Sequence, residues 1–140
     1  MSPTQTQIDS FLATPKLLGR LATVSARGMP HVVPVWYLWA DGCIWVHSFE
    51  STRKVRQLRK HAECAIVIDV IEKVEGLTAV LVEGEAELVT EPRPEVRSRA
   101  ERVYRRYLSP EELAAPDPQS WLNSAEGLIL KITPGKITAW

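Results

Sequence analysis

The order of the first elements is decided by residues 17–48, which read LLGRLATVSARGMPHVVPVWYLWADGCIWVHS. Apolar and β-branched residues dominate three parts of this stretch, and each part predicts a β-strand: 17–25, 31–39 and 43–47. The residues between them contain an Arg-Gly and an Asp-Gly pair, which are typical of tight turns. No crossover helix fits between these strands, so they are predicted to form an antiparallel meander.

The next segment, residues 51–62, changes from strand-like alternation to helical spacing. Val55, Leu58 and Ala62 recur on one face, and five basic residues fill the others. A basic amphipathic helix is expected here. Two long strands are expected after it, at 64–71 and 77–90, with Gly84 indicating a bulge in the second.

The two ends of the chain contain further helices and the closing strands. Helices are predicted at 4–13 and at 94–108, and the second has a buried stripe of Val96, Ala100, Val103 and Tyr107. Ser109 with Glu112 forms a capping-box pattern that begins another short helix. Strands at 128–133 and 136–140 are expected to close the sheet, separated by a break at Pro134 and Gly135.

These elements predict one α+β domain over residues 1–140, made mainly of β-strands. Six or seven mostly antiparallel strands with helices inserted at two places favour a β-barrel with flanking helices over a parallel doubly wound sheet. The length of 140 residues fits a single domain with a hydrophobic core.

The composition excludes several classes of protein. Apolar residues make up 45% and charged residues 24%, as in ordinary globular domains. Seventeen basic residues balance seventeen acidic ones, so no net field draws the molecule to nucleic acid or to a membrane. No apolar run approaches the roughly 20 residues that span a bilayer, and we expect a cytoplasmic protein. Cys43 and Cys64 lack metal-binding spacing and are expected to be buried thiols.

A candidate anion site lies in residues 48–60, SFESTRKVRQLRK, where a strand ends and a helix begins. Amides and the positive dipole at a helix N-terminus attract phosphate, and Arg53 and Lys54 add charge there. Without an anion, these cations oppose the dipole. In the alternative interpretation, Ser51 or Thr52 only caps the helix and the cations form a solvated face.

Pro34 and three tryptophans mark the second unusual region. A proline within a strand has no N–H to donate, so this strand is an edge, contains a bulge, or lies against something other than a strand, such as a flat ligand. Trp36, Trp39 and Trp45 cluster on this hairpin, as in a core or a dimer interface. The sequence has no Ser/His/Asp arrangement, GxGxxG motif or P-loop, so we assign no catalytic side chain and no metal site.

The succession of these segments resembles the pyridoxamine 5′-phosphate oxidase-like split-barrel family of flavin and deazaflavin proteins. The resemblance rests on the order of 21–48, then STRKVRQLRK, AIVIDV, VLVEGEAELV and ITPGKITAW. It implies a split β-barrel that binds FMN, or alternatively F420, and acts as an oxidoreductase on a small molecule. It also implies a homodimer with the cofactors at the interface, which the second subunit closes through Trp121 or Trp140.

The resemblance assigns cofactor-binding roles position by position. The second strand would run along the isoalloxazine ring, through Val33, Pro34, Val35 and Trp36. The third strand would lie beside the ring and the ribityl chain, through Val46, His47 and Ser48. Thr52, Arg53 and Lys54 would hold the phosphate.

The sequence departs from true vitamin B6 oxidases in the second strand. Their Arg and Lys positions correspond roughly to His31 and Trp36, so we do not expect pyridoxine phosphate as the substrate. F420 in place of FMN would need extra basic surface for its longer tail, such as Arg56 or Arg59. A non-catalytic module that binds flavin or haem is the alternative from another functional class.

Overall fold

The computed structural model describes residues 2–140, in which seven strands and five helices follow one another. The strands are β1 (Gly19–Val24), β2 (Pro30–Val35), β3 (Leu38–Ala40), β4 (Cys43–Phe49), β5 (Glu63–Val74), β6 (Leu77–Val89) and β7 (Gly127–Ala139). The helices are α1 (Gln5–Ala13), α2 (Arg53–Lys60), α3 (Arg93–Tyr104), α4 (Pro110–Leu113) and α5 (Pro116–Asn123).

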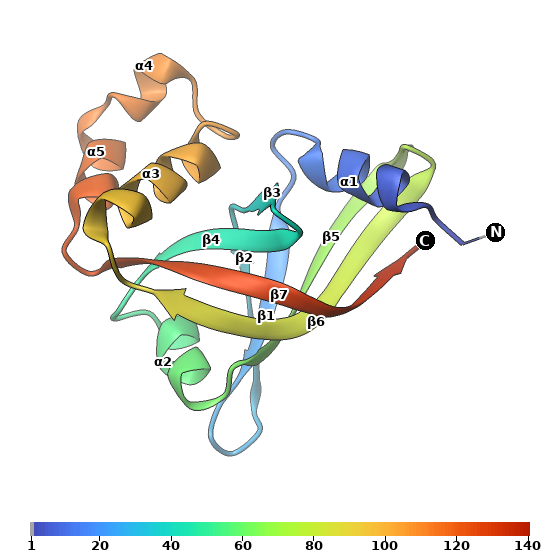
Figure 1. Ribbon diagram of the computed structural model, residues 1–140, viewed down its shortest axis with the longest axis horizontal. Helices are drawn as coiled ribbons and strands as arrows, with labels where there is room; N and C mark the ends of the chain where they lie inside the picture. The colour runs from blue at the N-terminus through green and yellow to red at the C-terminus, as the bar shows by residue number, and fades with distance from the viewer. Residues whose placement is uncertain (1) are drawn as a thin grey trace.

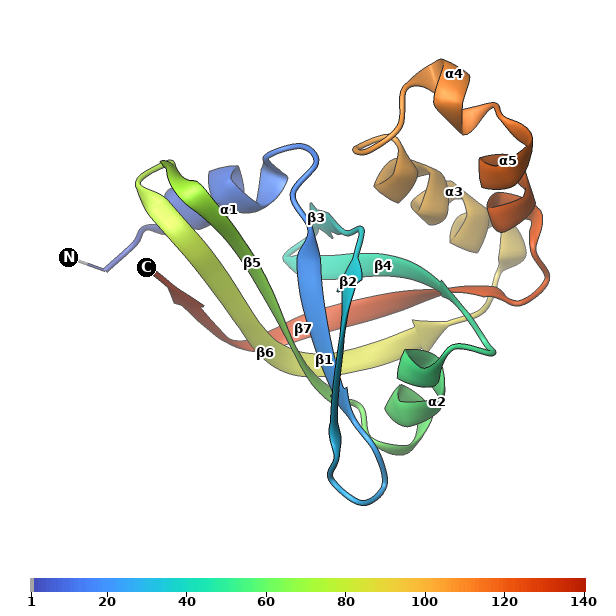
Figure 2. The ribbon, with the colours of Figure 1, turned by 180° about the vertical axis from the view of Figure 1, so that it is seen from behind.

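All seven strands form one antiparallel sheet in the order β2-β1-β5-β6-β7-β4-β3. The sheet curls so that its two ends approach each other, while α3, α4 and α5 gather at one end and α1 lies at the other (Figure 1). Helix α2 lies below the barrel beside the β1–β2 hairpin (Figure 2). The predicted α+β split barrel with flanking helices is thereby confirmed.

The meander predicted for the first three strands is correct in its two hairpins, β1–β2 and β3–β4, and wrong in joining them through one continuous strand. β1 and β2 pair as a hairpin, but β4 pairs with β7 and with the short β3. The segment 31–39 breaks at Trp36 and Tyr37 because Tyr37 is fully buried and its N–H donates to Tyr107 Oη, at 3.0 Å. β2 is therefore an edge strand, one of the alternatives that Pro34 indicated.

The bulge predicted at Gly84 is confirmed, whereas the break predicted at Pro134 and Gly135 is not. The β6–β7 register shifts between Glu83 and Gly84, where Gly135 of β7 has no partner and is the extra residue of the bulge. β7 nevertheless continues through Pro134 and Gly135 as one strand. A Cβ on Gly84 would lie 2.1 Å from the Thr133 carbonyl oxygen, so only glycine allows this approach.

Two clusters of buried side chains hold the barrel and the helices together. The first fills the barrel interior and includes Leu21, Ile66 and Leu130. The second lies between α3 and the outer face of β4 and β7, and includes Trp45, Val103 and Ile129. Both cysteines are buried free thiols, as expected.

The helical region after β6 differs from prediction in two places. α3 ends at Tyr104 rather than at residue 108, although Tyr107 still packs against the same cluster. The predicted capping box of Ser109 and Glu112 is present at α4, but α5 was not predicted. Among residues 2–140, no helix combines the length and the apolar character needed to cross a membrane.

Candidate functional site

The two ends of the sheet enclose a cavity of about 460 Å³, here called the split cavity. β2 and β4 both line it, although they lie far apart in the strand order and no ladder joins them. Helices α2, α3 and α5 complete its wall. The lining residues are Leu18, Pro34, Val35, Trp36, His47, Phe49, Lys54, Val103, Tyr104 and Trp121.

Aromatic side chains make the wall of the split cavity flat and rigid. The Trp36 ring stacks on Tyr107 with centroids 4.8 Å apart. Tyr104 and Trp121 meet the Trp36 ring edge-on, with centroids 5.9 and 6.5 Å away. Such offset and edge contacts are favourable for aromatic pairs, and the same surfaces suit a planar ligand.

His47 connects β4 to helix α3 through its contact with Tyr104. Its Nδ1 is hydrogen-bonded to Tyr104 Oη, and its ring meets those of Tyr104 and Phe49 edge-on. Burial, followed by the nearby charge of Arg93, lowers the pKa of His47 to about 4. Burial also raises the pKa of Tyr104, so both partners are neutral at pH 7.

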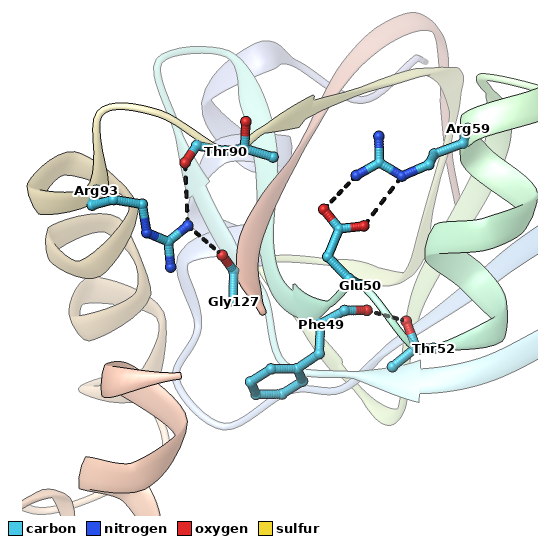
Figure 3. A network of polar contacts seen from close by, with 7 residues as sticks. All are labelled: Phe49, Glu50, Thr52, Arg59, Thr90, Arg93 and Gly127. Atoms are coloured by element: carbon cyan, nitrogen blue, oxygen red, sulfur yellow. Dashed lines mark hydrogen bonds and ion pairs between the residues drawn. The ribbon is translucent and has the colours of Figure 1, made fainter. Parts of the chain in front are cut away.

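The loop before α2 is held by the hydroxyls of Ser48 and Thr52. Thr52 Oγ1 donates to the Phe49 carbonyl at 2.9 Å, as Figure 3 shows. Ser48 Oγ lies 3.2 Å from Thr52 Oγ1, and since that hydroxyl already donates, Ser48 is the donor. No side chain caps α2, so the interpretation in which Ser51 or Thr52 caps this helix has no support.

Arg53 and Lys54 follow this loop and point to different sides of α2. Lys54 is half-buried and lines the split cavity, and burial lowers its pKa. Arg53 is exposed and lines a second depression of about 730 Å³ between α2 and the β1–β2 hairpin, here called the basic groove. Its lining residues are Ser25, Ala26, Met29, Pro30, His31, Arg53, Arg56, Gln57, Arg59 and Lys60.

Two of the cations of α2 already have partners in the loop. Arg59 forms a bidentate ion pair with Glu50 (Figure 3). Arg56 donates to the Ser51 carbonyl at 2.7 Å. These contacts fix the start of α2 between the split cavity and the basic groove.

The structure brings half of the expected cofactor-binding residues to one cavity. Pro34, Val35, Trp36, His47 and Lys54 line it together.

The other expected residues lie elsewhere. Val46 and Ser48 are buried on the opposite side of β4, and Val33 packs against the barrel core. Thr52 holds the loop before α2, and Arg53 lies in the basic groove.

Sequence reasoning missed Tyr104, and it assigned Trp121 to closing the site across a dimer. Trp121 lines the split cavity of its own chain, whereas Trp140 does not line it. Tyr104 follows the predicted α3 stripe at helical spacing from Ala100, one residue after Val103, which is the signal that could have found it.

Residues 4–140 match the protein family described as pyridoxamine 5′-phosphate oxidase, and the match covers nearly the whole chain. The chain belongs to the pyridoxamine 5′-phosphate oxidase family. The resemblance read from the sequence is therefore confirmed. No curated protein matches this chain significantly.

Solved structures agree with this family assignment at the level of the fold. A conserved hypothetical protein of Mycobacterium tuberculosis is 21% identical with a TM-score of 0.79, covering 100% of this chain and 86% of its own. An F420 reductase is 20% identical with a TM-score of 0.72, covering 92% and 94%. A FAD-binding protein of Mesorhizobium loti is 17% identical with a TM-score of 0.69, covering 99% and 95%.

The chemistry of the split cavity limits the kind of ligand that it could hold. The split cavity offers flat aromatic and apolar walls, and Lys54 stands half-buried at the uncapped start of α2 without a carboxylate in the cavity lining. This arrangement suits a planar ring system linked to a phosphate. Among residues 2–140, no three His, Cys, Asp or Glu side chains gather as a metal site would require.

Proposed function

We propose that this pyridoxamine 5′-phosphate oxidase family member is a flavin-type oxidoreductase that binds FMN. The observation that carries the proposal is the joining of the aromatic split cavity to an uncapped, doubly cationic helix start through Lys54. The isoalloxazine ring would lie in the split cavity, along Pro34, Val35 and Trp36. The phosphate would lie at the start of α2, beside Lys54, with Arg53 adding positive charge from the side of the basic groove.

The phosphate position is supported by electrostatics. The positive end of the α2 dipole repels the two adjacent cations, and a bound anion would offset this repulsion. Lys54 is partly desolvated, and an anion beside it would favour its charged form. Thr52 and Ser48 would act by holding the loop, because their hydroxyls already bond within it.

When bound, the flavin supplies the hydride chemistry, and the protein contributes binding, orientation and exclusion of water. Trp36 and Trp121 would fix the plane of the ring. The substrate would be a small molecule other than pyridoxine phosphate, since His31 and Trp36 stand where true vitamin B6 oxidases have basic residues.

Replacement of both cations tests the phosphate position. Each charge-assisted hydrogen bond contributes about 1.5–3 kcal/mol, so Arg53→Ala/Lys54→Ala should weaken FMN binding at least about 100-fold. Arg102→Ala/Arg105→Ala removes the same charge from exposed positions on and just after α3 and is the matched control. Equal FMN affinity of the two double variants in fluorescence titrations would refute the phosphate site.

F420 is the second candidate, and the basic groove favours it. Arg53, Arg56 and Lys60 line this groove next to the proposed phosphate site, where a long anionic tail could follow them. Arg56→Ala/Lys60→Ala should then weaken binding of polyglutamylated F420 and leave FMN binding unchanged. An equal effect on both cofactors would contradict F420 as the resident group.

Reduction of the bound cofactor distinguishes catalysis from simple binding. A bound cofactor that no hydride donor reduces, and that reduces no acceptor, would support the alternative of a non-catalytic flavin-binding or haem-binding module. We further propose a cytoplasmic homodimer in which a second copy covers the mouth of the split cavity.

A further inference from the structure

His47 lines two cavities, and its two ring nitrogens have different neighbours. Nδ1 meets the hydroxyl of Tyr104, which lines the split cavity. Nε2 lies toward Gly127, because a Cβ built on Gly127 would be 2.8 Å from that nitrogen. His47 also lines a second hollow of about 370 Å³, here called the outer cavity, together with Arg93, Arg97, Asn123 and Ser124.

We propose that Tyr104 and His47 form a proton relay that links the outer cavity to the ligand bound in the split cavity. The inference rests on the proposed function, because the ligand is the substrate of a hydride transfer. It adds a proton donor to a site in which the cofactor otherwise supplies all the chemistry.

The relay moves one proton without charging either side chain. Tyr104 Oη passes its proton to an acceptor atom of the substrate and takes the Nδ1 proton of His47. In the same step His47 Nε2 takes a proton from water of the outer cavity, and the hydroxide that remains exchanges with bulk solvent. The imidazole therefore stays neutral and changes tautomer. A bound, reduced flavin-type cofactor would supply the hydride, so that the substrate would gain one hydride and one proton. The reverse sequence carries a proton outward and restores the first tautomer.

The charges around His47 favour this neutral exchange over an imidazolium. Arg93 from the start of α3 disfavours the charged imidazole, Arg97 also lines the outer cavity, and Lys54 from α2 lines the split cavity. Among the described residues, no carboxylate lines either cavity. Arg93 is itself fixed by donating to the carbonyls of Thr90 at 3.1 Å and Gly127 at 2.7 Å (Figure 3). It also donates to the Ser124 carbonyl at 3.1 Å. A fixed cation disfavours a second positive charge, which leaves tautomer exchange as the route for the proton.

The first test uses Tyr104→Phe, which removes the hydroxyl and keeps the ring. Tyr107→Phe is the matched control, because that hydroxyl donates to the Leu17 carbonyl and Tyr107 does not line the split cavity. The protein is loaded with FMN, reduced, and mixed with the quinone menadione in H₂O and in D₂O. Tyr104→Phe should bind FMN as the wild type does, react about 100-fold more slowly and lose the solvent isotope effect of the wild type.

Rates and isotope effects that match those of Tyr107→Phe would overturn the relay. If the wild type binds neither FMN nor F420, the proposed function fails, and the relay is judged on the ligand-free protein. ¹⁵N NMR should then show a neutral His47 whose Nδ1 shift changes in Tyr104→Phe and not in Tyr107→Phe. Identical Nδ1 shifts in all three proteins would overturn the relay without reference to any cofactor.

Discussion

His47 occupies a position where a positive charge is disfavoured by burial first and by Arg93 second. The imidazole in an unfolded chain takes up a proton near pH 6.5, whereas His47 in the folded protein does so near pH 4. Between these values the unfolded state binds more protons than the folded state. The stability that the neutral imidazole contributes is therefore fully present above pH 6.5 and is lost as the pH falls toward 4.

This linkage predicts how the acid sensitivity of the protein depends on one residue. The contribution of His47 to the free energy of unfolding should fall by about 2 kcal/mol between pH 7 and pH 5. His47→Gln removes this contribution, so its unfolding free energy should fall less over the same interval. Urea unfolding of both proteins at the two pH values measures the difference. Equal losses, or an NMR signal showing a charged His47 at pH 5, would contradict the assignment.

At the scale of elements, Arg106 ties the segment after α3 to the start of the chain. Its guanidinium donates to the carbonyls of Leu12, Thr14 and Tyr37. It also lies 4.5 Å from the centroid of the Tyr37 ring. These contacts connect α1, the break after β2 and the end of α3, so they hold the helices in place over the split cavity.

Removing this guanidinium should therefore loosen the packing of the helices on the barrel. Arg106→Met removes the charged donor from three carbonyls, although those of Leu12 and Tyr37 keep a tyrosine hydroxyl as a second donor. It should lower the free energy of unfolding by about 3 kcal/mol, since bonds to one charged group are strong but not additive. Arg105→Met is the control, because Arg105 is exposed and pairs only with Glu101 in an i,i+4 ion pair of low energy. The urea midpoints of Arg106→Met and Arg105→Met measure the effect. Equal shifts of the two midpoints from the wild-type value would contradict the role of Arg106.

Local patterns in the sequence predicted most elements and failed where long-range contacts decide. The alternation at 77–90 and the capping box at Ser109 gave β6 and α4, because both signals are complete within a few residues. The path of β4 to the far end of the sheet depends on the burial of Tyr37 by partners about 25 and 70 residues away in the chain. Helix α5 was missed because two prolines and an aspartate, Pro116, Asp117 and Pro118, are typical of a loop, although Pro116 suits a first helical turn.

The residues of the candidate site were likewise predicted where the signal is local and missed where a long-range contact decides. Lys54 was found because a cationic helix start is unusual by itself, whereas Trp36 was assigned to the site by the resemblance to the family. Tyr104 and its bond to His47 join residues 57 positions apart, and no local pattern indicates such a contact.

At the scale of the whole molecule, the edge of the sheet indicates where a second copy would bind. β2 is an edge strand, and the apolar side chains of Met29 and Val32 on and beside it are 65% and 63% exposed. Pro34 follows on the same outward side of β2 and lines the split cavity. Exposed apolar edges favour association between chains, so the proposed dimer would cover this edge and the cavity mouth together.

This arrangement predicts that one substitution changes assembly and cofactor binding together. Val32→Lys places a charge on the proposed interface, where desolvation opposes it, and should convert a dimer of two 15.7 kDa chains into monomers. Because the cavity mouth would then face water, FMN affinity should fall in the same variant. Gln5→Lys, at an exposed position of α1, adds the same charge away from β2 and should change neither property. Light scattering measures the assembly, and titration measures the FMN affinity. A monomeric wild type would refute the dimer, and a dimeric Val32→Lys variant would place the dimer interface on another face.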